Sequence, residues 1–278
     1  MFGLKEYPLR RRLHDEVHAR PPSALGSPLH ISYLAMLSPR DNTAAEQQAL
    51  AELAATAGAE PPKPETSHYT ARIGDIEVKW ERHAEFARYK FIQRDTGDEP
   101  FAKSALDKLP EGWLAKLPGD VLVATEIAIA RGPLPYEFDD IIRRHFDGNT
   151  VVASLVSSGQ GCAMTDFRIR DDGRSRLLVF DLGMRPRQAG RAIQRLLEID
   201  TYRMMALLAL PGAQDLRPFL DQSERELADM TSKMANPNTA DDQKLLSRLT
   251  ALEGAIQGRQ ADNHYRLSAA KAYNEIVD

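Results

Sequence analysis

The chain has 278 residues, of which 42% are hydrophobic and 27% charged, and its formal net charge is −4. This is the composition of a globular protein with a sizeable core, and the mild acidity gives no reason to expect nucleic acid as a partner. The single cysteine, Cys162, excludes an internal disulfide, and no apolar run approaches the roughly 20 residues that cross a bilayer.

The first two thirds of the chain predict mixed α and β structure. The apolar stretches 28–37 and 120–130 are typical of buried strands. The Ala-rich segment 42–58 predicts a helix that begins near Asn42, its expected N-cap, and stops at Gly58. Alternating segments on both sides of Gly74-Asp75 predict a tight hairpin, and 85–94 continues the strand pattern. A short helix is expected at 138–146, followed by strands at 150–158, 162–170 and 175–183. We therefore expect one mixed α/β domain, residues 1–184, around a sheet of about six to eight strands with at least two antiparallel hairpins.

From Arg185 onward the strand signals vanish and helical periodicity takes over. The pattern predicts helices at about 186–210, ending at Pro211-Gly212, at about 214–234, and from Asp241 onward, the last being the longest at about 35 residues. The third helix carries the four-three-four spacing of a coiled-coil seam, at Leu245, Leu249, Leu252 and Ile256.

The second helix is the expected antiparallel partner of the third. It has apolar residues at seven-residue spacing, Leu220, Leu227 and Met234, and the polar stretch 260–264 would interrupt the contact. What this pairing leaves uncovered is expected to meet another subunit. Residues 185–278 thus predict a coiled-coil-like helical stalk, and the fold class is α+β.

The stretch HDEVHARPP, residues 14–22, concentrates polar chemistry near the start of the chain. Its two histidines are four apart, as in the His-Glu-x-x-His motif of zinc proteases, but an aspartate follows the first and the prolines at 21–22 disfavour a helix. We expect an extended segment in which Glu16, His18 and Arg20 share one face.

The stretch KWERHAEF, residues 79–86, predicts a second polar strand. Period two places Glu81, His83 and Glu85 on one face and Trp80, Arg82 and Phe86 on the other. Histidines and carboxylates of the two strands could hold a divalent metal or form an acid–base pair. Alternatively they form a solvated face with buried ion pairs to Arg20 or Arg82. Either way, we expect the two stretches to lie close together, because opposite charges in one domain are best buried as pairs.

Two further features favour structural roles. SSGQGCAM, residues 157–164, is followed by an alternating strand rather than by a helix, so it predicts a hairpin turn and not a phosphate loop. Cys162 lacks a local signature of an activated nucleophile, which favours a small, half-buried strand residue.

EVHARP (Glu16–Pro21) and WERHAEF (Trp80–Phe86) resemble the signature stretches of a bacterial family of uncharacterised membrane-anchored proteins, a domain of unknown function. The similarity continues through 191–213 and covers essentially the whole chain, with Ala84 where a threonine is expected. The resemblance gives no catalytic residues. Its signature positions here are Glu16, His18, Arg20, Pro21, Trp80, Arg82, His83 and Glu85.

The resemblance also implies a further C-terminal hydrophobic segment, which would place this soluble part on the cytoplasmic side of the bacterial inner membrane. The layout is similar to that of CorA-type cation channels, in architecture alone. Three functions therefore stay open. The favoured one is a non-enzymatic assembly or sensor head that self-associates through its helices. The alternatives are a metal-dependent or acid–base enzyme using Glu16, His18, His83 and Glu85, and a CorA-like ion transport component. No cofactor is predicted, a divalent metal being the one alternative.

Overall fold

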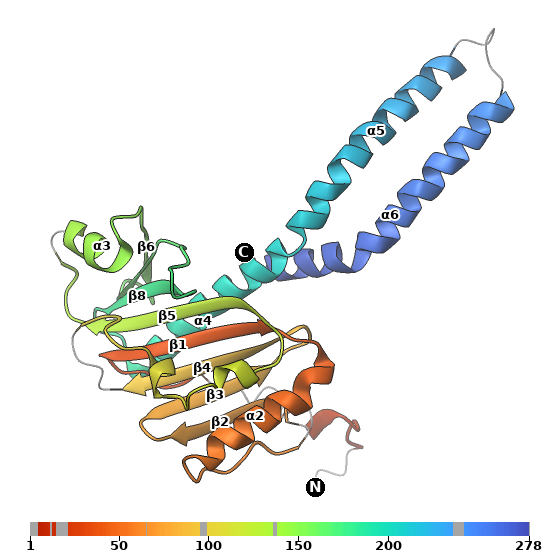
Figure 1. The fold of residues 1–278 in the computed structure, drawn as a ribbon. Helices are drawn as coiled ribbons and strands as arrows, with labels where there is room; N and C mark the ends of the chain where they lie inside the picture. Colours follow the sequence, from red (N-terminus) through yellow and green to blue (C-terminus); the bar gives the residue numbers. More distant parts are fainter. Residues whose placement is uncertain are drawn as a thin grey trace. The chain divides into compact units, whose positions relative to one another are not determined.

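The computed structural model describes residues 5–11, 13–14, 22–64, 66–94, 99–135, 138–235 and 242–277 (Figure 1). The chain divides into two compact units, Met1–Leu197 and Glu198–Asp278. None of the described helices combines the length and the apolar character that crossing a membrane requires.

The first unit is built on one eight-stranded mixed sheet with the strand order β2-β3-β4-β1-β5-β8-β7-β6. All neighbouring strands are antiparallel except β5 and β8, which run parallel. The predicted α+β class, the size of the sheet and the antiparallel hairpins are confirmed. The strands are β1 (Leu29–Leu37), β2 (His68–Ile73), β3 (Ile76–Arg82), β4 (Phe86–Arg94), β5 (Asp120–Arg131), β6 (Val152–Val156), β7 (Gly161–Thr165) and β8 (Ser175–Asp181).

One face of the sheet is covered by α2 (Thr43–Ala55), by two short 3₁₀ helices, η2 (Ala105–Lys108) and η3 (Leu114–Lys116), and by α3 (Asp139–Phe146). A third 3₁₀ turn, η1 (Arg40–Asn42), leads directly into α2. Apolar side chains of α2, among them Leu50 and Leu53, share a core with Trp80 and Tyr89 of the sheet. A second core joins Phe146 of α3 to residues of β7 and β8. This face of the sheet is thus buried under helices, and the central strands β1 and β4 are buried along nearly their whole length.

The first part of α4 (Pro186–Leu207), up to Leu197, passes behind the sheet in Figure 1. Its residues Ala189, Ile193 and Leu197 are buried. The preceding chain lies directly against this helix. The Leu25 N–H donates to the Pro186 carbonyl at 2.9 Å, and a Cβ on Gly190 would lie only 1.8 Å from the Ser23 carbonyl oxygen.

Two local expectations about the first unit are wrong. The strand predicted at 162–170 ends at Thr165, because the Asp166 carboxylate accepts from the Arg168 N–H and turns the chain, with Phe167 at a positive φ of 55°. Asn42 precedes α2 without capping it, since its amide donates instead to the Ser38 hydroxyl. The hairpin turn predicted within 157–164 is present at 157–160, with Gly159 at a φ of 82°, and β7 begins directly after it at Gly161.

The second unit contains the end of α4, α5 (Leu210–Met234) and α6 (Asp242–Val277), and α5 and α6 form the predicted antiparallel hairpin (Figure 1). At 36 residues α6 is the longest of these helices, as predicted. The first helix ends at Leu207 rather than at Pro211-Gly212. These two residues lie in the first turn of α5, where a proline loses only an N–H that has no helical partner.

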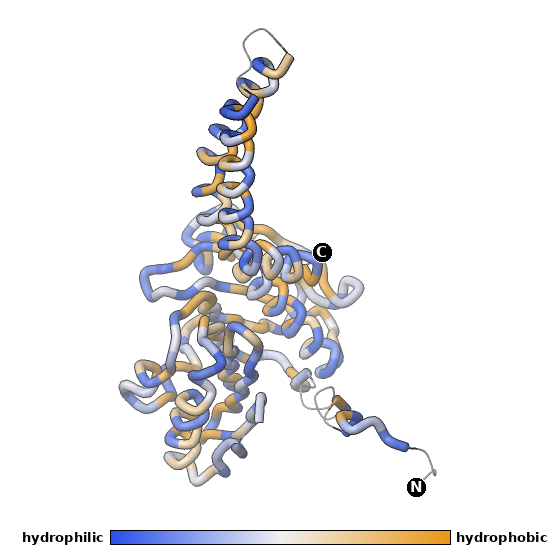
Figure 2. The backbone as a smooth tube through the Cα atoms, turned by 90° about the vertical axis from the view of Figure 1, so that its right-hand side faces the viewer, coloured by the Kyte–Doolittle hydropathy of each residue, from blue (hydrophilic) through white to orange (hydrophobic). Residues whose placement is uncertain are grey.

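The seam between α5 and α6 is only partly as predicted. On α6, Leu245 is buried and Leu249 and Leu252 are half-buried, which confirms that part of the predicted stripe. On α5, however, most of the predicted stripe lies outside the seam, although Leu220 also lines a hollow between the two helices. Three-four spacing places other, less exposed residues there, at Leu216, Phe219, Ser223, Glu226 and Met230. Figure 2 shows the mixture of apolar and polar residues along both helices. The predicted residues Leu220, Leu227 and Met234 are 48%, 49% and 60% exposed.

Candidate functional site

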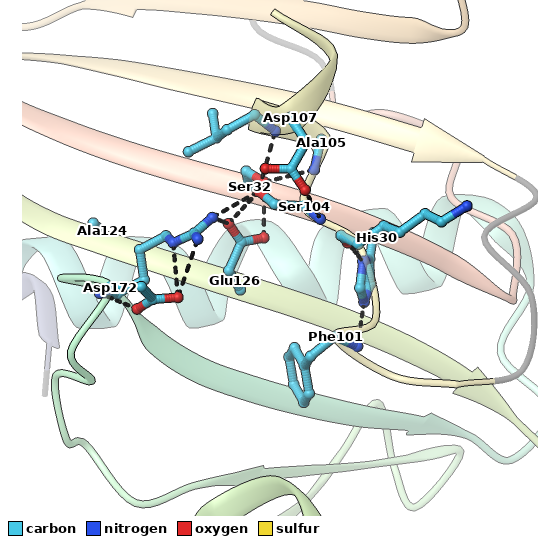
Figure 3. Close-up of polar contacts among 12 residues, drawn as sticks. His30, Ser32, Phe101, Ser104, Ala105, Asp107, Ala124, Glu126 and Asp172 are labelled. Atoms are coloured by element: carbon cyan, nitrogen blue, oxygen red, sulfur yellow. Dashed lines mark hydrogen bonds and ion pairs between the residues drawn. The ribbon is translucent and has the colours of Figure 1, made fainter.

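A cluster of buried polar side chains lies where β1 and β5 run side by side (Figure 3). Ser32 of β1 is directly opposite Glu126 of β5, and both lie on the face of the sheet that α2, η2 and α3 cover. The loop before η2 brings Ser104 onto this pair, and the turn before β8 brings Arg174. Ser32, Glu126 and Ser104 are all buried.

Glu126 is the centre of the cluster. Its Oε2 accepts from the Ser32 hydroxyl at 2.8 Å, and its Oε1 accepts from the Ser104 hydroxyl at 2.7 Å and from Arg174 Nη1 at 2.6 Å. Arg174 also pairs with Asp172, at 3.1 Å. Burial lowers the pKa of Arg174, but Glu126, Asp172 and Asp107 together raise it by more, so the net shift is upward. The carboxylate therefore lies beside a guanidinium that two acidic side chains hold in place.

The two serines are fully engaged. The Ser104 hydroxyl accepts from the Leu106 N–H and from Arg174, while the Ser32 hydroxyl accepts from the Ala105 N–H. Both hydroxyl protons go to one carboxylate, which also accepts from the arginine, and both lone pairs of Ser104 are occupied. This arrangement does not activate a serine nucleophile. It fastens the η2 loop and the turn at 171–174 to the sheet.

His30, two residues before Ser32 on β1, fixes the start of the same loop. Its Nε2 accepts from the Phe101 N–H at 2.8 Å, so the proton is on Nδ1, which lies 2.5 Å from the Lys103 carbonyl oxygen. Burial lowers the pKa of His30 against the opposing effects of that carbonyl and of Glu126. The imidazole is neutral and both ring nitrogens are used, so it serves neither as a metal ligand nor as a base.

Phe101 is held on several sides, in a left-handed backbone conformation with a φ of 62°. Its ring lies 5.8 Å from those of His30 and His145, and the Arg176 guanidinium lies 5.1 Å from its centroid. Arg176 also donates to the His145 carbonyl oxygen at 2.9 Å. Sequence reasoning did not find this cluster. The available signal was polar residues inside otherwise apolar strands, His30 and Ser32 in 29–37 and Glu126 in 120–131.

The first residues of the signature string WERHAEF bind helix α2 through Trp80 and Arg82. Glu46 of α2 is fully buried and accepts from Trp80 Nε1 at 3.1 Å and from Arg82 Nη1 at 2.8 Å. The Ser38 hydroxyl donates to the same carboxylate at 2.6 Å. Burial raises the pKa of Glu46, although Ser38, Arg82 and Trp80 all act in the opposite direction. Trp80 and Arg82 thus share one face of β3, as predicted, and bind a helix that the sequence did not connect with them.

Glu81 lies on the other face of β3. It pairs with Arg88, directly across on β4, and with Lys90 at 3.6 Å. Burial would raise the pKa of Glu81, but Lys90 and Arg88 lower it by more. The structure therefore separates Glu81 from Trp80 and Arg82, as period two requires.

The rest of KWERHAEF does not continue the strand, which corrects the prediction. β3 ends at Arg82 and the chain reverses through 83–85, closed by the His83 N–H donating to the Phe86 carbonyl at 2.9 Å. His83 and Glu85 consequently lie in a turn. Phe86 stands on the Glu81 face, because it is two residues before Arg88, and its ring stacks on that of His83 at 4.4 Å.

The other signature residues, Glu16, His18, Arg20 and Pro21, lie outside the described residues, so their proximity to WERHAEF stays a prediction. Within the described parts of the chain no three or more His, Cys, Asp or Glu side chains are grouped as metal ligands would be. Cys162 is buried in β7, and burial raises the pKa of its thiol, which favours the structural role predicted for it.

The second unit has a hollow of about 300 Å³ between α5 and α6. Phe219 and Ile256 line it, as do Gln260, Asn263 and His264 from the polar stretch. The Arg259 guanidinium lies 5.5 Å from the centroid of the Phe219 ring. α6 continues through 260–264, so the polar stretch interrupts the apolar seam and not the helix.

No curated protein and no solved structure matches this chain, and the likeness to CorA-type channels stays an expectation from layout. A family model, in contrast, matches residues 5–278, nearly the whole length. That match includes both signature strings and agrees with the resemblance they carry. The chain therefore belongs to the family described as "Protein of unknown function (DUF3422)".

Proposed function

We propose that this chain is a non-enzymatic assembly head whose helical hairpin binds a second copy of itself. The observation that carries the proposal is the exposed apolar stripe on α5. Leu220, Leu227 and Met234 recur every seven residues and are about half exposed or more, although the hairpin already has its own seam. Single exposed leucines are ordinary, but a row in register along one flank of a helix is the pattern of a helix–helix contact.

The chemistry of the first unit supports a non-enzymatic role. Two buried clusters of the first unit, around Glu126 and around Glu46, are each centred on a carboxylate whose oxygens accept from Ser, Arg or Trp side chains. Both clusters hold loops or a helix in place. An acid or base in catalysis needs a proton that it can exchange with a substrate, and neither cluster offers one.

The proposal includes the placement implied by the family resemblance. In that arrangement the head lies on the cytoplasmic side of a bacterial inner membrane, tethered by a hydrophobic segment outside this chain. The two signature strings support this placement. Self-association of the helices would then gather several heads at one point of the membrane.

The experiment is to place two charges in the stripe. In Leu220→Glu/Leu227→Glu the carboxylates would have to be buried in the contact between copies, which is costly without partners. We expect the wild-type chain to be dimeric or larger by sedimentation equilibrium, and the variant to be a monomer with unchanged helical circular dichroism. A wild-type chain that stays monomeric at high concentration would overturn the proposal.

The matched control uses the neighbouring stripe of α5. Gln214 and Ala228 are exposed and fall in register with Asp221, a natural acid on the same line. Gln214→Glu/Ala228→Glu adds the same charge to the same helix without touching the apolar stripe. We expect its mass distribution to match that of the wild type. If both variants dissociate equally, general charge repulsion and not the stripe is responsible.

A further inference from the structure

Strand β6 forms one edge of the sheet and has neither the charges nor the proline that usually protect an edge from pairing with another strand. This strand is last in the strand order and, among the described residues, pairs only with β7 (Figure 1). Its first four residues are exposed, Val152 to 55% and Leu155 to 64%. An edge strand presents unpaired N–H and C=O groups to any further strand, and proteins usually guard such edges with charges, proline or a bulge.

Charges and proline are both missing from this edge. Residues 149–165 contain no Asp, Glu, Lys, Arg or Pro, in a chain that is 27% charged. The opposite edge is different. β2 carries the exposed Arg72, and the turn that follows it carries Asp75, which pairs with Lys108 at 3.3 Å. The chain thus guards one edge of its sheet with charge and leaves the other neutral.

We propose that β6 pairs with β6 of a second copy, antiparallel, about a two-fold axis at Ser154. The strand Val-Ala-Ser-Leu-Val has nearly the same side-chain order in both directions. Val152 would lie opposite Val156 of the second copy, and Ala153 opposite Leu155. On one face the small Ala153 would then meet the large Leu155, and on the other the β-branched Val152 and Val156 would meet. Both kinds of cross-strand pair are favourable.

This symmetry is the reason for choosing a second copy as the partner. In an isologous contact residue i of one copy meets residue j of the other, and j meets i, so a charge on the axis would meet its own copy and a charge elsewhere would need an opposite charge at the position across from it. A neutral strand of nearly palindromic order meets this requirement without a penalty. The contact would join two eight-stranded sheets into one.

The apolar surface continues beyond the strand. Val152 pairs with Thr165, and the next turn of the chain exposes Phe167 to 52% and Ile169 to 74%. These two side chains would border the strand contact at its end. The interface is distinct from the α5 stripe, so a chain with both contacts would assemble beyond a dimer, into closed rings or open chains.

The test is a cysteine at the proposed axis, in the full chain carrying Cys162→Ala. Pairing about Ser154 brings the two Cα atoms of residue 154 to about 4.5–5.5 Å, within the range that a disulfide spans. We expect Ser154→Cys to give mostly cross-linked dimer on a non-reducing gel after mild oxidation with diamide. Val152→Cys is the control for register, because its two copies would be four residues, roughly 13 Å, apart and would not cross-link.

A second pair of variants tests the edge itself. In the Ser154→Cys background, Leu155→Lys should lower the cross-linked fraction several-fold, whereas Thr70→Lys, at an exposed position of the guarded edge β2, should leave it unchanged. Leu220→Glu/Leu227→Glu should leave the Ser154 cross-link in place, which separates this contact from the helical one. Equal cross-linking of Ser154→Cys and Val152→Cys, or none of either, would overturn the proposal.

Discussion

Arg82 and Glu46 form an ion pair in the interior of the first unit, with Nη1 and Oε1 2.8 Å apart and side chains 6% and 0% exposed. The pair links strand β3, part of a signature string, to helix α2. Each charge is tolerated there because the other is present, since water hardly reaches either side chain at its buried position.

The first prediction follows from that dependence. Arg82→Met should cost about 3–5 kcal/mol of unfolding free energy, because it leaves the Glu46 carboxylate buried without its cation. The double variant Glu46→Gln/Arg82→Met should be more stable than Arg82→Met alone, since the orphaned charge is gone. Urea denaturation at pH 7 measures both, with Arg72→Met, an exposed arginine of β2, as the control. A double variant no more stable than the single one would contradict the ion pair.

Glu81 gives a prediction about acid stability. Because Lys90 and Arg88 lower its pKa below the ordinary value of 4.5, Glu81 stabilises the fold above pH 4.5, and this contribution is lost as the pH falls through the lower, folded-state pKa. Glu81→Gln should therefore be clearly less stable than the wild type at pH 7 and approach it at pH 3. Urea denaturation from pH 7 to pH 3 measures this, with the exposed Glu111→Gln as the control. If the pairing is absent, the difference in unfolding free energy between wild type and Glu81→Gln will not depend on pH.

His30 should make the fold less stable below neutral pH. Burial lowers its pKa, so the unfolded chain takes up a proton near pH 6.5 before the folded one does, and stability falls as the pH drops from there through the folded-state pKa. The difference in unfolding free energy between wild type and His30→Gln should shrink from pH 7 to pH 5. His264→Gln, an exposed position of α6, should show no such change. Nitrogen chemical shifts should give the Nδ1–H tautomer at pH 7, and a doubly protonated ring at that pH would refute the assignment.

Two helical glycines should respond in opposite directions to the same substitution. Gly190→Ala places a Cβ 1.8 Å from the Ser23 carbonyl oxygen, a backbone atom that cannot turn aside, and we expect a loss of about 1–3 kcal/mol. Gly258→Ala meets nothing within 4 Å and should gain up to about 1 kcal/mol from helix propensity. Thermal unfolding of the two variants measures the contrast. A stable Gly190→Ala protein would mean that residues 22–25 do not lie against α4.

Much of the fold was readable because its signals are local. Period-two alternation and the Gly74-Asp75 turn predict β2 and β3, and three-four periodicity predicts α5 and α6. The reversal at 83–85 was missed because His-Ala-Glu contains none of the usual turn residues. The α5 seam was misplaced because a second row of residues, which includes Leu216, Phe219 and Met230, runs along an adjacent flank of the helix, and periodicity alone does not say which row meets α6.

The polar cluster was harder to predict, because it depends on which strands are neighbours. Ser32 and Glu126 are 94 residues apart and meet because β1 lies between β4 and β5, an order that alternation within a strand does not encode. Similarly, Arg82 was expected to take part in ion pairs, but its partner, Glu46, lies on a helix whose position over β3 is a tertiary fact.

The last prediction concerns the two signature strings together. Glu16, His18 and Arg20 are still expected to lie beside WERHAEF, where Glu85 occupies the turn between β3 and β4. If Arg20 pairs with Glu85, the variants Arg20→Ala and Glu85→Ala should not be additive. Their coupling in a double-mutant cycle should be at least about 0.5 kcal/mol of unfolding free energy. Arg20→Ala combined with Glu111→Ala is the control pair and should be additive within about 0.3–0.5 kcal/mol. Additivity of the Arg20 and Glu85 variants would show that this pair of charges does not meet. A measured coupling would make EVHARP and WERHAEF a single structural unit, with Trp80 and Arg82 holding α2 on one face of β3.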